Sequence, residues 1–448
     1  MSVATLEQAL RAEKSPIEML RNSKQGSFVF PDLPQEYTHW IEEQRAWRES
    51  CALFDQSYHM TDVYVRGPDA FDLFVDLDIG DYDEFSVGQA KQFMPCNSDG
   101  YTIGDGILFY LAEDELLVIG APMAPNWVQY NAETGDYDVS VERDGSSLER
   151  DGPPKTFRYQ VQGPNASSVM EDVVEGPLPD IQFFNFDQLS ISGRSLQALR
   201  HSMSGEAGFE IWGDYERAGD TKDAILEAGQ EYGIRQLGTR AYRSSAPMSG
   251  WIELQLPAIY DGEAMAGYRE WLSSESIEAN CSIGGSFYSE DVTDYYLSPV
   301  DLGHKDRVDF GHDFVGKEAL RDKVDNPERT KVSLFWNSDD VVDVYRSLFH
   351  EGETFKSIDL LDPIWSVAHY DEVRKDGETI GVSKWPTYNY NERAMLSLAC
   401  VDVEYSEPGT ETTLIWGEPN STRPQVERHV DKEIRVTVGP SPPAGDRR

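Results

Sequence analysis

The hydrophobic pattern of the first half of the chain changes period within short distances. Met60 to Arg66 has the two-residue alternation of a strand, and the turn sequence Gly67-Pro68-Asp69 leads into a predicted helix at Ala70 to Asp76. Further short strands and a helix are predicted at Phe93 to Cys96, Ile107 to Leu111, Glu115 to Ile119 and Ala124 to Asn131.

The same strand, turn and helix recur further along. Phe157 to Gln162 predicts a strand, Gly163-Pro164-Asn165 a turn, and Ala166 to Glu171 a helix. The strings VYVRGPDAFDLF and YQVQGPNASSVM are thus two copies of one unit, which indicates an internal duplication. Short strands mixed with helices favour an α+β fold.

The two ends of the chain differ from this central region. Residues 1 to 24 predict one polar helix, Ser27 to Tyr37 an extended arm on a domain surface, and Glu42 to Phe54 a helix. Strands dominate from Lys331 onward, at Lys331 to Trp336, Gly381 to Trp385, Met395 to Val401 and Glu411 to Trp416. We therefore expect an N-terminal helix and arm (1–44), a central region with two subdomains (about 45–150 and 151–327), a β domain (328–438) and a disordered tail (439–448).

The charge of the chain is extreme. It carries 80 acidic and 39 basic side chains, a net charge of −41, and the acidic residues are spread along its whole length. That distribution indicates a folded protein with an evenly acidic surface. Because self-repulsion at this charge destabilises the compact state at low salt, we hypothesise a salt-rich cytoplasm of the halophilic kind. A nucleic-acid partner is not expected, since its phosphates would be repelled.

Motif spacing narrows the class of protein further. No pair among Cys51, Cys96, Cys281 and Cys400 has metal or redox spacing, so we expect buried thiols and no metal site. The N-terminus lacks an apolar signal core, and no apolar run could span a membrane, which predicts a cytoplasmic protein without a membrane partner. The phosphate-binding loop, dinucleotide, HExxH and nucleophile-elbow signatures are all missing, which argues against metal, NAD and serine chemistry.

Longer strings resemble a known family. CALFDQSYHMTDVYVRGPDA, GEAGFEIWG and SPVDLGHKDRVDFGHDFVGKEAL resemble the aminomethyltransferases (glycine cleavage T-proteins), and the resemblance covers nearly the whole chain. AYRSSAPMSGWI, LPAIYDGE, YREWL, GGSF, WGEP and VERHVDKEIR are more similar to the tetrahydrofolate-dependent aromatic O-demethylases of that superfamily, which act on vanillate and syringate. This resemblance implies a three-domain cloverleaf around a central folate channel, a C-terminal β-barrel, and tetrahydrofolate as cofactor.

The resemblance also implies which residues hold the folate. Glu210 stands in the family's glutamate-bearing strand, with Glu206 as the runner-up. A buried carboxylate can accept two hydrogen bonds from the amide-like face of a pterin. Asp105 is a further candidate, although the glycine enzyme has two adjacent aspartates where Gly106 follows here. Arg240 is expected to pair with a carboxylate of the folate tail or of the substrate.

The expected chemistry is displacement at a methyl carbon. A folate ring nitrogen attacks the methyl group, and the leaving phenolate-like oxygen needs a proton or a strong hydrogen bond. Tyr242 matches the demethylases' catalytic tyrosine, and we assign it that role, because its ordinary pKa of about 10 is close to a phenol's. The predicted substrate contacts are Gln56, Tyr58, His59, Arg243 and Trp251, with Trp251 stacking on a flat ring.

Three functions stay open from the sequence. The first is transfer of a methyl group from a vanillate-like methoxy-aromatic compound to tetrahydrofolate, giving 5-methyltetrahydrofolate and a phenol. The second keeps the scaffold but uses a sulfonium (dimethylsulfoniopropionate-like), methylated-amine or glycine-cleavage substrate. The glycine enzyme's LRLEAG string is replaced by SSAPMSG, which weighs against glycine cleavage and a lipoyl carrier partner. The third is a folate-binding protein without transfer activity.

Overall fold

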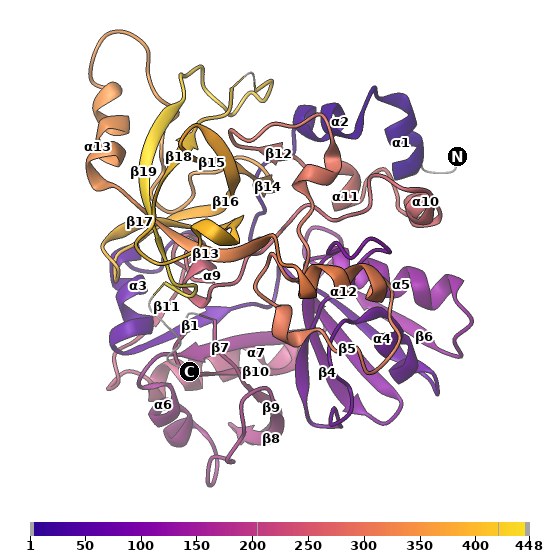
Figure 1. The fold of residues 1–448 in the computed structure, drawn as a ribbon. Coiled ribbons are helices and arrows are strands. Elements are labelled where there is room, and N and C mark those ends of the chain that lie inside the picture. Colours follow the sequence, from indigo (N-terminus) through magenta and orange to yellow (C-terminus); the bar gives the residue numbers. More distant parts are fainter. Residues whose placement is uncertain (1–3, 204, 420, 444–448) are drawn as a thin grey trace.

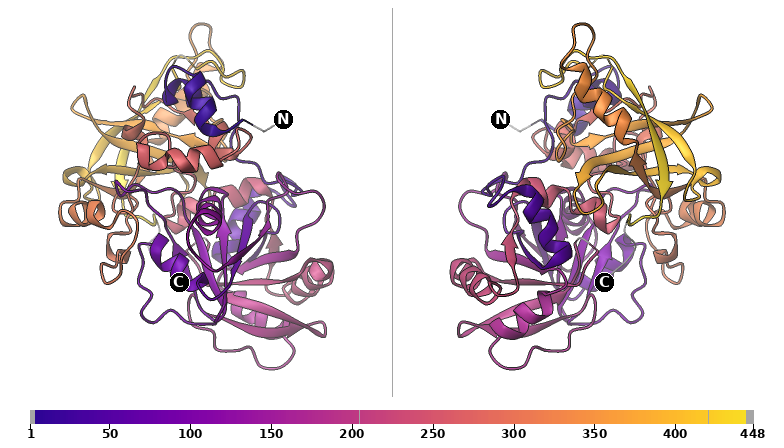
Figure 2. Two further views of the ribbon diagram at one scale, coloured as in Figure 1. Left: turned by 90° about the vertical axis from the view of Figure 1, so that its right-hand side faces the viewer. Right: turned by 90° about the vertical axis from the view of Figure 1, so that its left-hand side faces the viewer.

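The computed structural model describes residues 4–203, 205–419 and 421–443 (Figure 1). Two β-sheets lie at one end of the molecule, and a β-barrel lies at the other beside the N-terminal helices, as the side views show (Figure 2). Helices cover the outer faces, so the predicted α+β class is confirmed. No helix among the described residues combines the length and the apolar character needed to cross a membrane.

The first sheet has five antiparallel strands in the order β3-β4-β5-β2-β6. Its elements are β2 (Thr61–Arg66), β3 (Ala90–Phe93), β4 (Gly106–Ala112), β5 (Glu115–Gly120), β6 (Ser140–Asp144), and the packed helices α4 (Ala70–Leu77) and α5 (Met123–Thr134). Gly67 makes the turn into α4 with φ of 145°, and a Cβ there would lie 2.2 Å from the Asp138 carbonyl oxygen. The turn therefore requires glycine.

The second sheet repeats this unit. Its order is β11-β1-β7-β10-β9-β8, built from β1 (Cys51–Asp55), β7 (Thr156–Gln162), β8 (Phe186–Ile191), β9 (Arg194–Arg200), β10 (Gly208–Asp214) and β11 (Ile234–Gln236), with α6 (Ala166–Val173) and α7 (Ala218–Ala228). Gly163 turns β7 into α6 with φ of 123°, as Gly67 does after β2. The strand–Gly-Pro–helix unit thus occurs twice, as the two matching strings predict.

Two sequence predictions near the N-terminus are wrong. The single helix over residues 1 to 24 is two helices, α1 (Leu6–Ala12) and α2 (Pro16–Asn22), because Ser15 caps a new helix at Pro16. The helix predicted to reach Phe54 is α3 (Trp40–Glu49), followed by strand β1. All five residues of β1 are buried, so the strand has no polar alternation by which to recognise it.

The central region does not divide at residue 150. Strand β1 precedes the first sheet in the chain but belongs to the second sheet. Residues from Ile252 to Leu302 return to the first sheet, where they share one core with Val63 and Leu73. This segment follows α8 (Thr239–Arg243) and α9 (Ala246–Ser249), contains α10 (Ala266–Trp271), α11 (Ile277–Asn280) and β12 (Ile283–Gly284), and precedes α12 (Lys317–Asp325).

The C-terminal strands close into a barrel in the order β13-β17-β16-β15-β18-β19, which confirms the predicted β-barrel. The elements of this region are β13 (Arg329–Trp336), α13 (Ser338–Ser347), β14 (Ala368–His369), β15 (Asp371–Lys375), β16 (Glu378–Asn389), β17 (Ala394–Asp402), β18 (Glu411–Trp416) and β19 (Lys432–Gly439). The tail predicted at 439–448 begins too early, since Gly439 still pairs with Ser333. Residues 444–448 lie outside the described part of the chain.

Candidate active site

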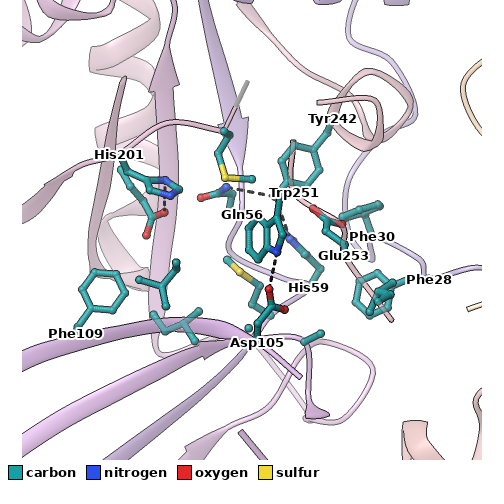
Figure 3. A pocket seen from close by; sticks show the side chains of 18 residues that line it. Phe28, Phe30, Gln56, His59, Asp105, Phe109, His201, Tyr242, Trp251 and Glu253 are labelled. Atoms are coloured by element: carbon teal, nitrogen blue, oxygen red, sulfur yellow. Dashed lines mark hydrogen bonds and ion pairs between the residues drawn. The ribbon is translucent and has the colours of Figure 1, made fainter. Parts of the chain in front are cut away.

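A pocket lies where the extended N-terminal arm, the two sheets and the segment after α9 meet (Figure 3). It encloses about 800 Å³ including its open mouth, and half of its 18 lining residues are apolar side chains. Six residues predicted from the sequence line it: Gln56, His59, Asp105, Glu210, Tyr242 and Trp251. They come from separate elements, so the fold brings them together.

Tyr242 is the polar centre of the pocket. Its side chain stands on α8, is 7% exposed, and packs edge-on against Phe30 and Phe54. The tyrosine oxygen accepts a hydrogen bond of 3.3 Å from the Gln56 amide and lies 3.2 Å from His59 Nε2. Burial, reinforced by the charge of Glu253, raises the pKa of Tyr242 well above its ordinary value. The hydroxyl therefore stays protonated and available as a donor.

His59 is a neutral partner for that hydroxyl. Burial lowers the pKa of His59 to about 3, so its Nε2 can accept the tyrosine proton. Phe28 and Phe30 pack against the imidazole at ring-centroid distances of 6.4 and 4.8 Å. The arm that carries both phenylalanines was predicted to lie on a domain surface; instead, its aromatic side chains form one wall of the pocket.

Two further carboxyl groups line the pocket. Asp105 immediately precedes β4 of the first sheet, and Glu253 lies in the segment after α9. Asp105 accepts a 2.6 Å hydrogen bond from Trp251 Nε1 (Figure 3), and burial raises the pKa of Asp105 to about 6 despite that bond. Burial, with the nearby charge of Asp105, also raises the pKa of Glu253 to about 7, against the opposing effect of Arg243. Glu253 is therefore partly protonated near neutral pH, whereas Asp105 is mostly ionised.

Glu210 lines the pocket beside His201. It projects from β10, is 6% exposed, and accepts a hydrogen bond from Arg158, whose guanidinium is also 3.7 Å from Asp62. His201 Nδ1 is 3.8 Å from the second Glu210 oxygen. Since a carboxylate has about four lone-pair sites, Glu210 keeps acceptor capacity for a ligand.

The two predicted arginines do not line this pocket. Arg240 is partly exposed and pairs with Glu36 and Asp359, each at 3.1 Å. Arg243 pairs with Asp362 at 3.1 Å and donates to the Phe28 carbonyl oxygen at 3.0 Å. Arg240 thus belongs to a surface ion-pair network, and Arg243 holds the N-terminal arm in place by its hydrogen bond to Phe28.

Glu206 and Tyr58 also lie outside the pocket lining. Glu206 is within 3.2 Å of Arg48 Nε, and the Tyr58 hydroxyl is 3.1 Å from that of Tyr215. Their partners lie far away in the sequence, so no local pattern could show these pairings. Conversely, sequence reasoning missed Phe28, Phe30 and Glu253. The aromatic residues of the arm were the available signal for the first two.

Comparison with known proteins agrees with this architecture. Residues 21–248 match the GCVT N-terminal domain family. The chain is 40% identical to syringate O-demethylase of Sphingobium sp. (strain NBRC 103272 / SYK-6), covering 98% of this chain and 96% of that one. It is 31% identical to sesamin methylene transferase of Sinomonas sp. (strain No.22), covering 93% and 91%. The crystal structure of the glycine cleavage system aminomethyltransferase T from Bartonella henselae superposes with a TM-score of 0.63 at 17% identity, covering 100% of this chain and 99% of that one.

The chain belongs to the aminomethyltransferase (GCVT) family, as the sequence strings predict. The T-protein-like fold is likewise confirmed. It is an enzyme of a tetrahydrofolate-dependent family.

Proposed function

We propose that this enzyme transfers a methyl group from a methoxy-aromatic compound to tetrahydrofolate, giving a phenol and 5-methyltetrahydrofolate. The observation that carries the proposal is the Tyr242 hydroxyl, held by Gln56 and His59 inside an aromatic-lined pocket. A flat aromatic ring fits among such side chains. The similarity to syringate O-demethylase over nearly the full length supports the same reaction class.

Tyr242 is the proposed proton donor. A bound tetrahydrofolate would supply the nucleophilic nitrogen that accepts the methyl group. The Tyr242 hydroxyl would give its proton to the ether oxygen, which keeps the electron pair of the broken bond to the methyl carbon. The proton lost by the methylated nitrogen would restore the tyrosine. Because the Gln56 amide already donates to the tyrosine oxygen, the tyrosine hydrogen can turn from His59 to the ether.

Glu210 and Asp105 are the proposed folate contacts. The pterin ring presents adjacent N–H donors, and Glu210 has unused lone pairs on a carboxylate whose charge is balanced by Arg158. Asp105 is oriented by Trp251 (Figure 3) and lines the same pocket as Glu210 and Tyr242. A folate bound by both carboxyl groups would therefore share this pocket with Tyr242. Arg240 and Glu206 have no part in this proposal, because their side chains lie elsewhere.

The decisive assay is incubation with tetrahydrofolate and a panel of methoxy-aromatics, sulfonium compounds and methylated glycines. We expect 5-methyltetrahydrofolate from methoxy-aromatics only. Product from a sulfonium compound alone would favour the second function, and folate binding without product from any compound would favour a binding protein. Turnover by Tyr242→Phe separates ether from sulfonium chemistry, because a sulfonium leaves without needing a proton.

We further propose that the enzyme works in a reducing, salt-rich cytoplasm. All four cysteines are buried and free, and burial raises the pKa of the Cys51 thiol to about 12. The net charge of −41 suits high ionic strength, where repulsion between surface carboxylates is screened. Neither a lipoyl carrier protein nor a nucleic acid is part of the proposed reaction.

A further inference from the structure

The carboxyl groups that line the pocket are not matched by lysine or arginine side chains. Among the described residues, no lysine or arginine lines it, whereas Asp105, Glu210 and Glu253 all do. The remainder of the lining is aromatic, aliphatic, or neutral and polar, apart from two histidines. The pKa of His59 is too low for this side chain to be a cation near neutral pH, and His201 lies 3.8 Å from the Glu210 carboxylate, which would offset a positive charge on its ring. An anionic ligand would therefore find no lysine or arginine within the described lining.

Two arginines that contact lining residues of the pocket are already engaged in ion pairs. Arg158 is bound to Glu210 and lies 3.7 Å from Asp62. Arg243 is bound to Asp362 and to a carbonyl oxygen of the arm. Recruiting Arg158 for a substrate carboxylate would leave the buried Glu210 carboxylate without its partner, which is costly. Recruiting Arg243 would break its ion pair with Asp362 and its hydrogen bond to the arm.

A further pair of cations lies in an adjoining groove. Lys331 and Arg307 line that groove, which shares Trp251 and His201 with the pocket, but neither lines the pocket itself. The charge of Lys331 acts on Asp105, at the side of the pocket next to the groove. Phe28, Phe30 and Glu253 gather instead beside Tyr242 (Figure 3).

That part of the pocket suits a neutral ring. Phe28 and Phe30 offer two aromatic surfaces, and the Glu253 carboxyl faces the same space (Figure 3). In its protonated form Glu253 can donate a hydrogen bond to an uncharged ether, hydroxyl or carbonyl oxygen. In its ionised form it accepts from a phenol O–H and repels a carboxylate.

We infer that the methyl donor is an uncharged methoxy-aromatic compound, and that this pocket discriminates against substrates bearing a ring carboxylate. The inference rests on the proposed function, whose substrate class it narrows. It replaces the vanillate-like acid that the sequence predicts with a neutral analogue. It also sets this chain apart in specificity from its syringate-demethylating relative, whose substrate carries a carboxylate.

The test compares two probes of almost identical shape, 4-hydroxy-3-methoxybenzamide and 4-hydroxy-3-methoxybenzoate. Each is given to the enzyme with tetrahydrofolate near neutral pH, and formation of the demethylated product is measured. We expect kcat/KM for the amide to exceed that for the acid by roughly 100-fold or more, because the acid buries an unpaired charge. Equal values, or a preference for the acid, would overturn the inference.

Calorimetric binding of both probes to the enzyme–folate complex keeps this result separate from the proposed function. If neither probe is demethylated, the proposed function fails, but tighter binding of the amide still supports a neutral ligand, and tighter binding of the acid refutes it. Glu253→Gln should reduce the amide-to-acid ratio about tenfold, since it removes one repelling charge. Glu404→Gln makes the same charge change at an exposed position and should leave the ratio unchanged.

Discussion

Replacement of Tyr242 by phenylalanine removes one oxygen from the proposed reaction centre. The ring keeps its packing against Phe30 and Phe54, so the shape of the pocket is preserved. The nitrogens of Gln56 and His59 lose the partner that lies 3.3 and 3.2 Å away. An unsatisfied buried group costs about 1–3 kcal/mol, so the variant should fold with reduced stability.

The effect on rate should be much larger than the effect on folding. General acid catalysis contributes typically about 10²–10⁴-fold, so kcat for a methoxy-aromatic donor should fall by about that factor. KM should change little, because the aromatic walls remain. Single-turnover formation of 5-methyltetrahydrofolate at saturating folate measures the step directly.

Tyr58→Phe is the matched control. It deletes the same atom from a tyrosine whose hydroxyl contacts Tyr215 outside the pocket lining, so its kcat should stay near wild type. A Tyr242→Phe enzyme within about threefold of wild-type kcat would refute proton donation by this residue.

The remaining predictions concern folate affinity and stability. Glu210→Gln should weaken tetrahydrofolate binding at least about tenfold, since it removes a charge-assisted acceptor, and unchanged affinity by calorimetry would exclude Glu210 as the pterin contact. The pKa of Glu253 is about 7 in the folded state, so the folded enzyme retains a proton that the unfolded chain releases above its ordinary pKa of 4.5. Glu253→Gln should therefore match wild type in urea unfolding below about pH 4 and become the more stable by up to about 3 kcal/mol as the pH rises to about 8; a constant difference would contradict this. The melting temperature should rise between about 0.1 and about 2 M KCl, and no rise would remove the case for a salt-rich cytoplasm.

Alternating polarity and glycine turns predicted those strands and helices whose burial in the fold follows the local sequence pattern. Strand β2 alternates and is followed by the glycine turn that α4 requires, so its prediction succeeds, and β7 with α6 repeats the pattern. Strand β1 is buried on both faces, and its true neighbours, β7 and β11, lie far along the chain. No local period reveals such a strand, which is also why the boundary at residue 150 fails.

The site shows the same division between local and long-range information. Family strings led to Tyr242, Asp105 and Glu210, and the fold places all three in one pocket. The assignments of Arg240 and Arg243 rested on charge alone, and their partners lie 119 or more residues away in the sequence. An arginine that is already paired cannot be distinguished in sequence from one that is free for a ligand.

The central claim is that a methyl group moves intact from an aryl ether to tetrahydrofolate. A methoxyphenol carrying an isotopic label in its methoxy carbon tests it most directly, when it is incubated with enzyme and tetrahydrofolate and followed by NMR. We predict that the label appears in the N5-methyl group of 5-methyltetrahydrofolate, in a one-to-one amount with the phenol product. Label that stays on the aromatic ring, or that leaves as formaldehyde, would contradict the claim.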